Sequence, residues 1–240
     1  MRRPRIGGRL RKRRHAGGAV RYGRCPPGRI RNPDSVHSAA LDDALDEYGL
    51  DPSDELYRAL DGHAYTDAFA DACRELGVDP VDFYAAREQR SAVRSIEHLK
   101  AGSRTLYPDV DALEALAERH DLALVSNNYD PTVAFVVDHF RLDHFEFARG
   151  RDLGVEGFSR RKPDPYYLQE ALDHFGVSDA VYVGDRETDV RAAARAGLDG
   201  IYLRRDHNVN AELAVEPVAE IESLHELSPL LGGTDREPTL

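Results

Sequence analysis

Three short stretches of the chain combine residue types that could hold a phosphoryl group and a metal ion. The first is Ser126, Asn127 and Asn128, directly after the apolar run 122–125. Hydroxyl and amide groups at the end of a strand, just before a helix, can donate hydrogen bonds to phosphate oxygens. Serine and asparagine also cap helices, so the same stretch fits a structural role.

The second stretch, residues 184–189, follows another apolar run at 180–183. Gly184 permits a tight turn, Asp185 then projects from the strand end, and Asp189 lies four residues later at the start of a predicted helix. Carboxylate oxygens suit Mg²⁺, which also accepts phosphate oxygens and waters as ligands. Alternatively, Asp185 or Thr188 caps the helix while Asp189 interacts favourably with its dipole, and both interpretations can hold together.

The third stretch is centred on Lys162, which comes directly before Pro163 and Pro165. The two prolines stiffen the approach to a helix that Asp164 can cap, so the ammonium group is aimed rather than free. Such a point charge can neutralise a phosphoryl group. The neighbouring arginines at 160–161 leave a solvated basic loop as the alternative.

Short apolar runs alternate with helical patterns from residue 107 onward. Strands are predicted at 122–125, 144–148, 180–183 and 200–203, and helices at 108–120, 130–139, 164–175 and 188–196. This alternation predicts an α/β fold with a parallel sheet covered by helices on both faces. Ligands bind beyond the carboxyl ends of the strands in such sheets, so the chemistry should lie just after Val125, Val183 and Leu203.

Residues 35–104 carry helical patterns and no strand signal. Helices are predicted around 41–50 and at 54–60, 66–76 and 80–100. Gly77 is placed to end the third of these helices, and the fourth is rich in Ala, Arg and Glu. The pattern predicts an all-helical subdomain ahead of the α/β core.

Charge is divided unevenly along the chain. Residues 1–33 contain 12 Lys and Arg and no Asp or Glu, whereas the other 207 residues carry 20 basic and 43 acidic side chains, a net charge of −23. The acidic body is typical of proteins that work in high salt. The basic segment could be a disordered arm or a nucleic-acid tail, but the acidic body repels a polyanion, so we expect no nucleic-acid partner.

Length and composition limit the remaining classes. The 240 residues fit one ordinary domain, or a core with a smaller inserted domain. No stretch approaches the ~20 apolar residues of a membrane helix, and the basic N-terminus lacks the apolar run of a secretory signal. Cys25 and Cys73 show no metal-ligand or disulfide-framework spacing. We expect a cytoplasmic protein, monomeric or dimeric, with no membrane partner.

The order of Ser-Asn at 126–127, Lys-Pro-Asp-Pro at 162–165 and Gly-Asp-x-x-x-Asp at 184–189 resembles the haloacid dehalogenase superfamily. The resemblance covers roughly 105–205, and the helical block is similar to the family's inserted cap. It implies a Rossmann-like parallel-sheet core with a helical cap subdomain. The expected domains are an aberrant basic segment, predicted to be disordered, at 1–33, a cap at 34–104, a core at 105–232 and a tail at 233–240.

The resemblance also implies roles for individual residues. Ser126 and Asn127 are expected to bind the phosphoryl group, Lys162 to bind it and stabilise charge during transfer, and Asp185 with Asp189 to bind Mg²⁺. The implied activity is a Mg²⁺-dependent, phosphoglycolate-phosphatase-like hydrolysis of a small phosphorylated metabolite through an aspartyl-phosphate. A dehalogenase is also compatible with the fold, but Lys162 and the turn at Asp185 suit phosphate and metal better.

The family's attacking aspartate has no counterpart in this chain. The family places it at the end of the first strand, before the cap, in a pattern like Asp-x-Asp-Gly-Thr-Leu, whereas the first acidic residue here is Asp34, which follows no apolar strand. Reading the codons of residues 7–17 one base later permits Val-Val-Val-Phe-x-Asn-Asp-Gly-Thr-Leu-Val, although the shifted codon at Arg11 cannot encode Asp. We hypothesise that residues 1–33 are a frameshifted first motif. A non-catalytic phosphate- or Mg²⁺-binding relative is the alternative function.

Overall fold

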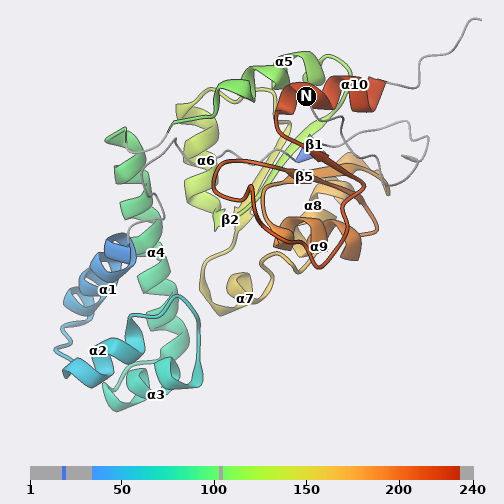
Figure 1. Cartoon of the computed structure of the whole chain (residues 1–240). Helices are drawn as coiled ribbons and strands as arrows, with labels where there is room; N and C mark the ends of the chain where they lie inside the picture. The colour runs from blue at the N-terminus through green and yellow to red at the C-terminus, as the bar shows by residue number, and fades with distance from the viewer. Residues whose placement is uncertain (1–17, 20–33, 103–104, 233–240) are drawn as a thin grey trace, which may run out of the picture.

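The computed structural model describes residues 18–19, 34–102 and 105–232, and it shows two parts of different architecture (Figure 1). Residues 34–102 are the helical subdomain, and the later residues build an α/β core around a sheet. The long helix α4 (Pro80–Lys100) runs from the helical subdomain to the core, where it packs against α6 (Asp130–His139). The predicted arm and the predicted tail at 233–240 fall outside the described residues, apart from Gly18 and Ala19.

Six parallel strands form one sheet within the described residues, in the order β3-β2-β1-β4-β5-β6. They are β1 (Gly18–Ala19), β2 (Leu122–Tyr129), β3 (Phe147–Arg151), β4 (Val181–Gly184), β5 (Asp199–Leu203) and β6 (Ala219–Ile221). The chain adds strands on one side of β1 and then on the other, so the topological switch point lies at β1. This sheet confirms the predicted α/β fold, and the switch point is where such sheets bind ligands.

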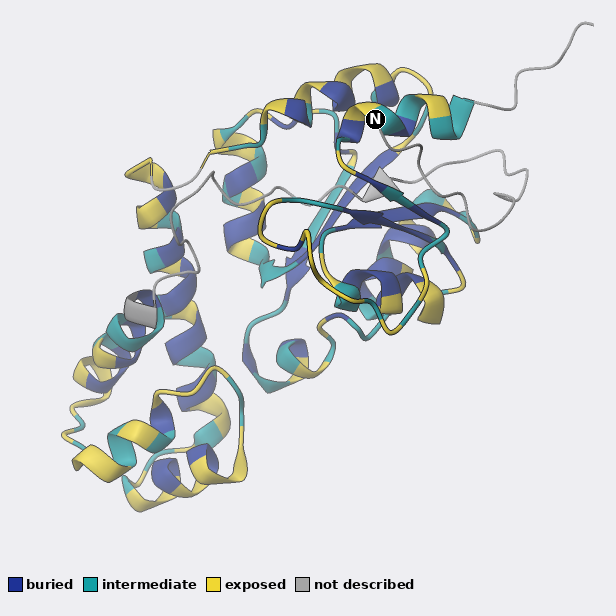
Figure 2. Cartoon of the chain, in the orientation of Figure 1, coloured by how far each residue is buried: buried dark blue, intermediate teal, exposed yellow. Residues whose placement is uncertain are grey.

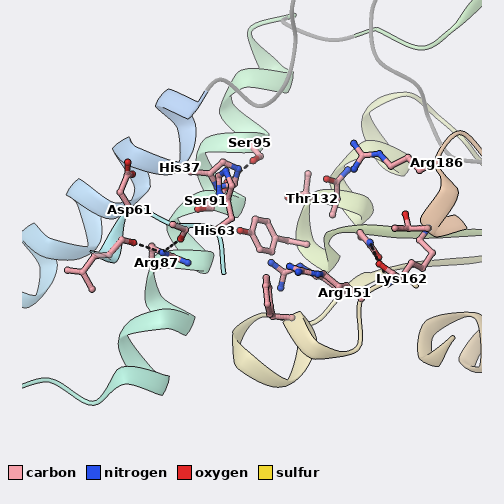
Figure 3. A pocket seen from close by; sticks show the side chains of 18 residues that line it. His37, Asp61, His63, Arg87, Ser91, Ser95, Thr132, Arg151, Lys162 and Arg186 are labelled. Carbon is pink, nitrogen blue, oxygen red and sulfur yellow. Dashed lines mark hydrogen bonds between the residues drawn. The ribbon is translucent and has the colours of Figure 1, made fainter. Parts of the chain in front are cut away.

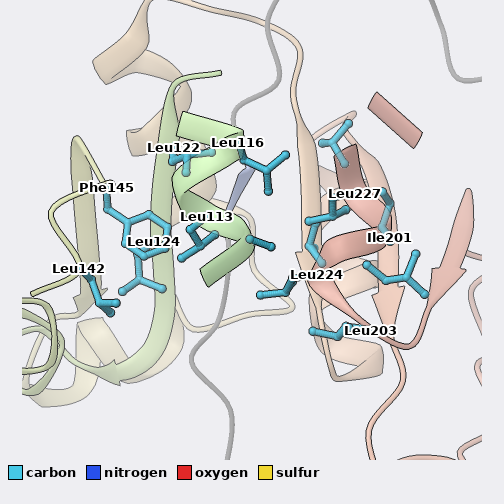
Figure 4. Packing of buried hydrophobic residues seen from close by; sticks show 14 of the residues in the cluster. Leu113, Leu116, Leu122, Leu124, Leu142, Phe145, Ile201, Leu203, Leu224 and Leu227 are labelled. Carbon is cyan, nitrogen blue, oxygen red and sulfur yellow. The ribbon is translucent and has the colours of Figure 1, made fainter. Parts of the chain in front are cut away.

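Side chains alternate between the two faces of the sheet along its central strands. Leu122 and Leu124 pack into one hydrophobic cluster, shown in Figure 4. Ala123, Val125 and Tyr182 pack into the other. The first face is covered by η1 (Pro108–Asp111), α5 (Ala112–Ala117), α6, η2 (Leu224–Glu226) and α10 (Leu227–Gly232), and the second by α8 (Tyr166–Phe175) and α9 (Glu187–Arg195). Burial of both faces is typical of a parallel sheet.

The helical subdomain begins its helices at well-formed caps. Ser53 accepts the N–H of Leu56, Thr66 accepts that of Phe69, and Asp79 accepts those of the first turn of α4. Its other helices are α1 (Asp34–Tyr48), α2 (Asp54–Leu60) and α3 (Asp67–Glu75). Their buried sides share a cluster of aromatic and aliphatic side chains. The buried residues of these helices are dark blue in Figure 2. The described residues here are helical or in turns, as the sequence predicts.

Helix α7 (Gly154–Ser159), which the sequence does not predict, connects the two parts. Its Val155 and Phe158 pack against the cluster of the helical subdomain although the helix follows β3 of the core. Beside it, Glu88 of α4 forms a buried ion pair with Arg151 at the end of β3, at 2.5 Å. Glu88 also accepts the N–H of Gly154 at 2.7 Å. One buried carboxylate therefore links α4, β3 and α7.

Two predictions about strands were wrong. The sequence predicts no strand in residues 1–33, yet Gly18 and Ala19 form β1 between β2 and β4. Two residues are too few to show periodicity. They become a strand because their backbone groups pair with those of β2 and β4 on either side. The sequence also predicts a strand at 144–148, whereas β3 spans Phe147–Arg151 because its pairing with β2 begins at Phe147.

Candidate active site

A cavity of about 400 Å³ lies beyond the carboxyl ends of the central strands, between the core and the helical subdomain (Figure 3). Asn127, Lys162 and Arg186 line it from the core, and His63 and Arg87 line it from the helical subdomain. These side chains come from five segments of the sequence between residues 63 and 186 and meet only in the folded chain. The cavity is polar, and several of its lining groups are cationic.

Lys162 is almost completely buried, with a side chain that is 1% exposed. Its Nζ lies 3.0 Å from Oδ1 of Asp189 and donates to the carbonyl of Val125 at 2.9 Å and to the hydroxyl of Tyr182. A buried ammonium group is tolerated only when its charge and its protons find partners, and these groups provide them. The site therefore contains a positive charge held in one place.

Asn127 ties the loop of Lys162 to the end of β2. Its Nδ2 donates to the Lys162 carbonyl at 3.0 Å, and its Oδ1 accepts the Lys162 N–H at 2.9 Å. The sequence predicts Asp164 as the cap of α8; the N-cap is Pro165, and Asp164, one residue before it, accepts the N–H of Tyr166 at 2.9 Å. Asn127 thus positions Lys162 through the backbone as well as lining the cavity.

Ser126 lies deeper than its neighbours and is fully buried. Its Oγ accepts the N–H of Asn128 at 3.1 Å, within the part of β2 where the pairing with β3 shifts register after Val125. Asn127 and Asn128 line the cavity. The structure thus places Ser126 behind the two asparagines, and its predicted contact with a phosphoryl group stays a prediction.

The two aspartates of residues 184–189 lie in different surroundings. Asp189 is fully buried; its Oδ2 accepts the N–H of Arg186 at 3.1 Å, and its Oδ1 faces Lys162. A Cβ added to Gly184 would lie 2.3 Å from the Cβ of Asp189, so only glycine allows this approach. Asp185 is 13% exposed and lies 3.1 Å from Nε2 of His207. Asp185 is therefore the accessible carboxylate, and Asp189 is the internal partner of Lys162.

The chemistry of this donor set fits Mg²⁺ in part. No cluster of three or more His, Cys, Asp or Glu side chains suited to a metal exists in the described ranges. Mg²⁺ keeps several waters and is commonly held by one or two carboxylates together with substrate phosphate. Asp185 can provide one such carboxylate, which is the smallest number that this kind of Mg²⁺ site needs.

The central strand β1 does not lead to a carboxylate. Ala19 is in register with Ala123 of β2 and Tyr182 of β4, the strands that lead to Ser126 and Asp185. The residues that follow it, 20–33, include no Asp or Glu in the sequence. The middle of the three strands that converge on the site thus leads into sequence with no acidic group.

A family model for haloacid dehalogenase-like hydrolases matches residues 35–197, more than half of the chain. The chain belongs to this family. The match includes the stretches around Asn127, Lys162 and Asp185 and begins after the basic segment. The family resemblance in the three motifs is therefore confirmed.

Curated relatives of this haloacid dehalogenase-like chain include phosphoglycolate phosphatases. It is 31% identical over 134 residues to the phosphoglycolate phosphatase of Aliivibrio fischeri, which covers 53% of this chain and 58% of that protein. It is 32% identical over 130 residues to phosphoglycolate phosphatase 1 of Pseudomonas aeruginosa, which covers 52% and 46%. The chain spans about half the length of the curated relatives it matches.

Solved structures share the fold. A predicted phosphoglycolate phosphatase from Haemophilus somnus gives a TM-score of 0.57 at 22% identity, covering 91% of this chain and 97% of that one. CbbY from Rhodobacter sphaeroides, solved in complex with phosphate, gives 0.55 at 20% identity, covering 89% and 96%. None of the helices in the described ranges combines the length and hydropathy that a membrane crossing requires.

Sequence reasoning missed three residues of the haloacid dehalogenase-like site. Tyr182 lies inside an apolar strand pattern, where the natural interpretation is core packing. Arg151 ends β3 and lines the cavity, and His207 lies in the loop after β5 and meets Asp185; no motif marks either residue. The only available signal was the alternation in β4, which places Tyr182 on the face opposite Val181 and Val183.

Two arginines on the cavity wall, Arg87 and Arg151, have their positive charges stabilised by different groups. Burial opposes the charge of Arg151, but the hydrogen bonds and attraction of Glu88 outweigh it and raise the Arg151 pKa. Arg87 stacks on the rings of Phe69 and Tyr84. It donates to the carbonyl of Leu60, the last residue of α2, at 2.7 Å and to that of Gly62 in the following loop at 2.6 Å. Arg87 is only 6% exposed, so these aromatic and carbonyl groups stabilise its charge in place of water.

Proposed function

We propose that this chain is a phosphatase-type hydrolase that binds a small phosphorylated metabolite at the carboxyl edge of its sheet. The observation that carries the proposal is the buried ammonium group of Lys162, held against Asp189 at the edge of the cavity. A fixed positive charge in a water-poor place interacts strongly with a phosphoryl group and needs no reorganisation when charge develops. The named phosphoglycolate phosphatases among its relatives support the same reaction class.

Different residues bind the phosphoryl group and the metal ion in this proposal. Lys162 binds and neutralises phosphoryl oxygens, Asn127 and Ser126 offer hydrogen bonds beside it, and Asp185 with support from Asp189 holds Mg²⁺. The metal, when bound, supplies further neutralisation of charge on the phosphoryl oxygens. Asn127 orients Lys162 through its two backbone contacts.

The aspartyl-phosphate route needs an attacking carboxylate that residues 20–33 do not contain. A catalytic family member whose first motif is frameshifted in this chain is our leading interpretation. A non-catalytic relative that binds phosphate and Mg²⁺ is the alternative, and the absence of Asp and Glu before residue 34 favours it for the chain as written.

The helical subdomain is proposed to act as a cap that chooses the substrate. It contributes Arg87, His37 and His63 to the cavity, while Arg161 and Arg186 line it from the core. Cationic and imidazole groups around a phosphate site suit a substrate with a second anionic group, as phosphoglycolate has. The cytoplasmic location and a monomeric or dimeric state stay predictions.

Hydrolysis of 2-phosphoglycolate and of p-nitrophenyl phosphate with Mg²⁺ tests the proposal, together with calorimetric binding of inorganic phosphate. Turnover that disappears in Asp185→Asn and persists in Asp206→Asn supports the enzyme, because Asp206 is an exposed aspartate beside His207. Phosphate binding without turnover supports the non-catalytic relative. A chain that neither binds phosphate nor hydrolyses either ester contradicts both.

A further inference from the structure

The hydroxyl of Tyr182 reaches the same point as the ammonium group of Lys162. Tyr182 lies on β4 and is 2% exposed. Its hydroxyl accepts a hydrogen bond from Lys162 Nζ and donates one to the carbonyl of Val125 at 3.1 Å. Lys162 donates to that same carbonyl at 2.9 Å. The ammonium, the phenol and the carbonyl therefore form a closed triangle.

The strand geometry explains why a tyrosine can occupy this place. Successive residues of β4 face opposite sides of the sheet, so Val181 and Val183 join one cluster and Tyr182 joins the cluster beneath α8 and α9. Lys162 approaches that same face from the loop before α8. The ring of Tyr182 spans the face, with Lys162 Nζ 5.0 Å from its centre, and carries the hydroxyl to the ammonium group.

A lysine side chain has four carbons and several rotatable bonds, so holding its charge in one place costs conformational entropy. Asp189 supplies the opposite charge at 3.0 Å. The triangle adds two directional contacts from another side of the ammonium group. A phenylalanine at 182 keeps the ring and removes one of these contacts, which leaves Lys162 less well directed.

We propose that Tyr182 is a positioning residue that fixes Lys162 for phosphate binding without touching the substrate. The proposal rests on the proposed phosphate site. A purely structural Tyr182 satisfies its hydroxyl at the Val125 carbonyl and affects folding alone, whereas a positioning Tyr182 affects affinity for phosphate in a chain that remains folded.

The test is the affinity of the full chain for inorganic phosphate in the presence of Mg²⁺, measured by calorimetry for the wild type and Tyr182→Phe. We expect about tenfold weaker binding, with a cooperative urea transition retained. Tyr202→Phe is the matched control, because Tyr202 is an equally buried tyrosine on β5 that faces Arg204.

The outcomes separate this inference from the proposed function. A wild-type chain that does not bind phosphate overturns both. A wild type that binds, with equal affinity in Tyr182→Phe, overturns only the role of Tyr182. Loss of the folded state in Tyr182→Phe, or equal losses of affinity in Tyr182→Phe and Tyr202→Phe, also overturns it, because the hydroxyl is then a structural group.

Discussion

The two walls of the cavity are built in different ways. On the core side, Lys162 lines the cavity, and Ser126 and Asp189 lie behind its surface; all three are at most 2% exposed. Hydrogen bonds and an ion pair hold Lys162 to β2, to β4 and to Asp189. On the helical side, Asp61 and His63 are exposed and lie on a loop between α2 and α3. That loop is anchored mainly from beneath, by Arg87 and by the hydroxyl of Tyr84.

The difference separates a rigid site for chemistry from an adjustable surface for recognition. A phosphoryl group of constant shape needs charges that are already in place, and buried groups on strand ends provide them. Substrates differ in the rest of the molecule, and an exposed loop on another subdomain can vary without disturbing the core. Glu88 and Arg151 lie at the joint between the two walls.

The largest effect is expected on the core wall, from Lys162→Ala. The change leaves Asp189 as a buried charge without its cation, which costs about 3–5 kcal/mol of unfolding free energy, and it removes phosphate binding. Urea denaturation and phosphate calorimetry measure the two losses. Lys100→Ala, at an exposed lysine that ends α4, is the control and should change neither. Unchanged phosphate affinity in Lys162→Ala contradicts the proposed site.

The second-largest effect is expected at the joint between the two walls, from Glu88→Ala. Without this carboxylate, the buried guanidinium of Arg151 loses its ion pair and the N–H of Gly154 loses its acceptor. We expect the unfolding free energy to fall by about 3 kcal/mol. Urea denaturation measures the loss. Glu97→Ala on the same helix is the control, because Glu97 is exposed and a surface change of this kind stays within about 0.5 kcal/mol. Equal effects of the two changes would mean that the pair does not join the subdomains.

A pair of glycines compares the walls directly. Gly184→Ala forces a Cβ to within 2.3 Å of Asp189 and is expected to cost about 1–3 kcal/mol and to weaken phosphate binding. Gly62→Ala, on the loop of the helical subdomain, adds a methyl group that meets no atom within 4 Å. Thermal unfolding and phosphate calorimetry of both variants provide the measurement. A tolerant Gly184 and a sensitive Gly62 would reverse the proposed division between the walls.

The smallest effect is a pH dependence confined to the helical subdomain. The hydrogen bond and charge of Arg94 lower the pKa of Asp43, despite partial burial. The stability from this pair is therefore present above the unfolded pKa of about 4 and is lost as the pH falls through the lower folded value. Urea denaturation between pH 6 and pH 3 should show a shallower loss for Asp43→Asn than for the wild type. If the unfolding free energies of the wild type and Asp43→Asn fall equally with pH, the Asp43–Arg94 pair does not contribute to stability.

Much of the fold could be predicted from local pattern. Helices α2, α4 and α6 begin and end at the predicted residues, because Ser53 and Asp79 cap the first two and proline opens the latter two. Helix α7 and strand β6 were missed, since short elements carry little periodicity and are selected by partners far along the chain. The strand β1 was missed for the same reason.

The candidate site shows the same limit. Asn127, Lys162, Asp185 and Asp189 could be selected from motif and spacing, because strand-end positions in a parallel sheet converge on one edge. The division of roles between Asp185 and Asp189 could not, because it depends on which carboxylate is buried against Lys162. Tyr182 could not be distinguished from a core residue until Lys162 was placed beside it.

The sequence alone determined the α/β class, the helical subdomain, the three motifs and the lack of an acidic residue before Asp34. These depend on side-chain periodicity, turn residues and residue identity, which are local properties. Only the tertiary structure decided that Gly18 and Ala19 lie in the centre of the sheet, that Glu88 joins the subdomains and that Tyr182 meets Lys162. Each of these is a contact between distant segments, and such contacts form only when the buried polar groups of the whole fold find their partners.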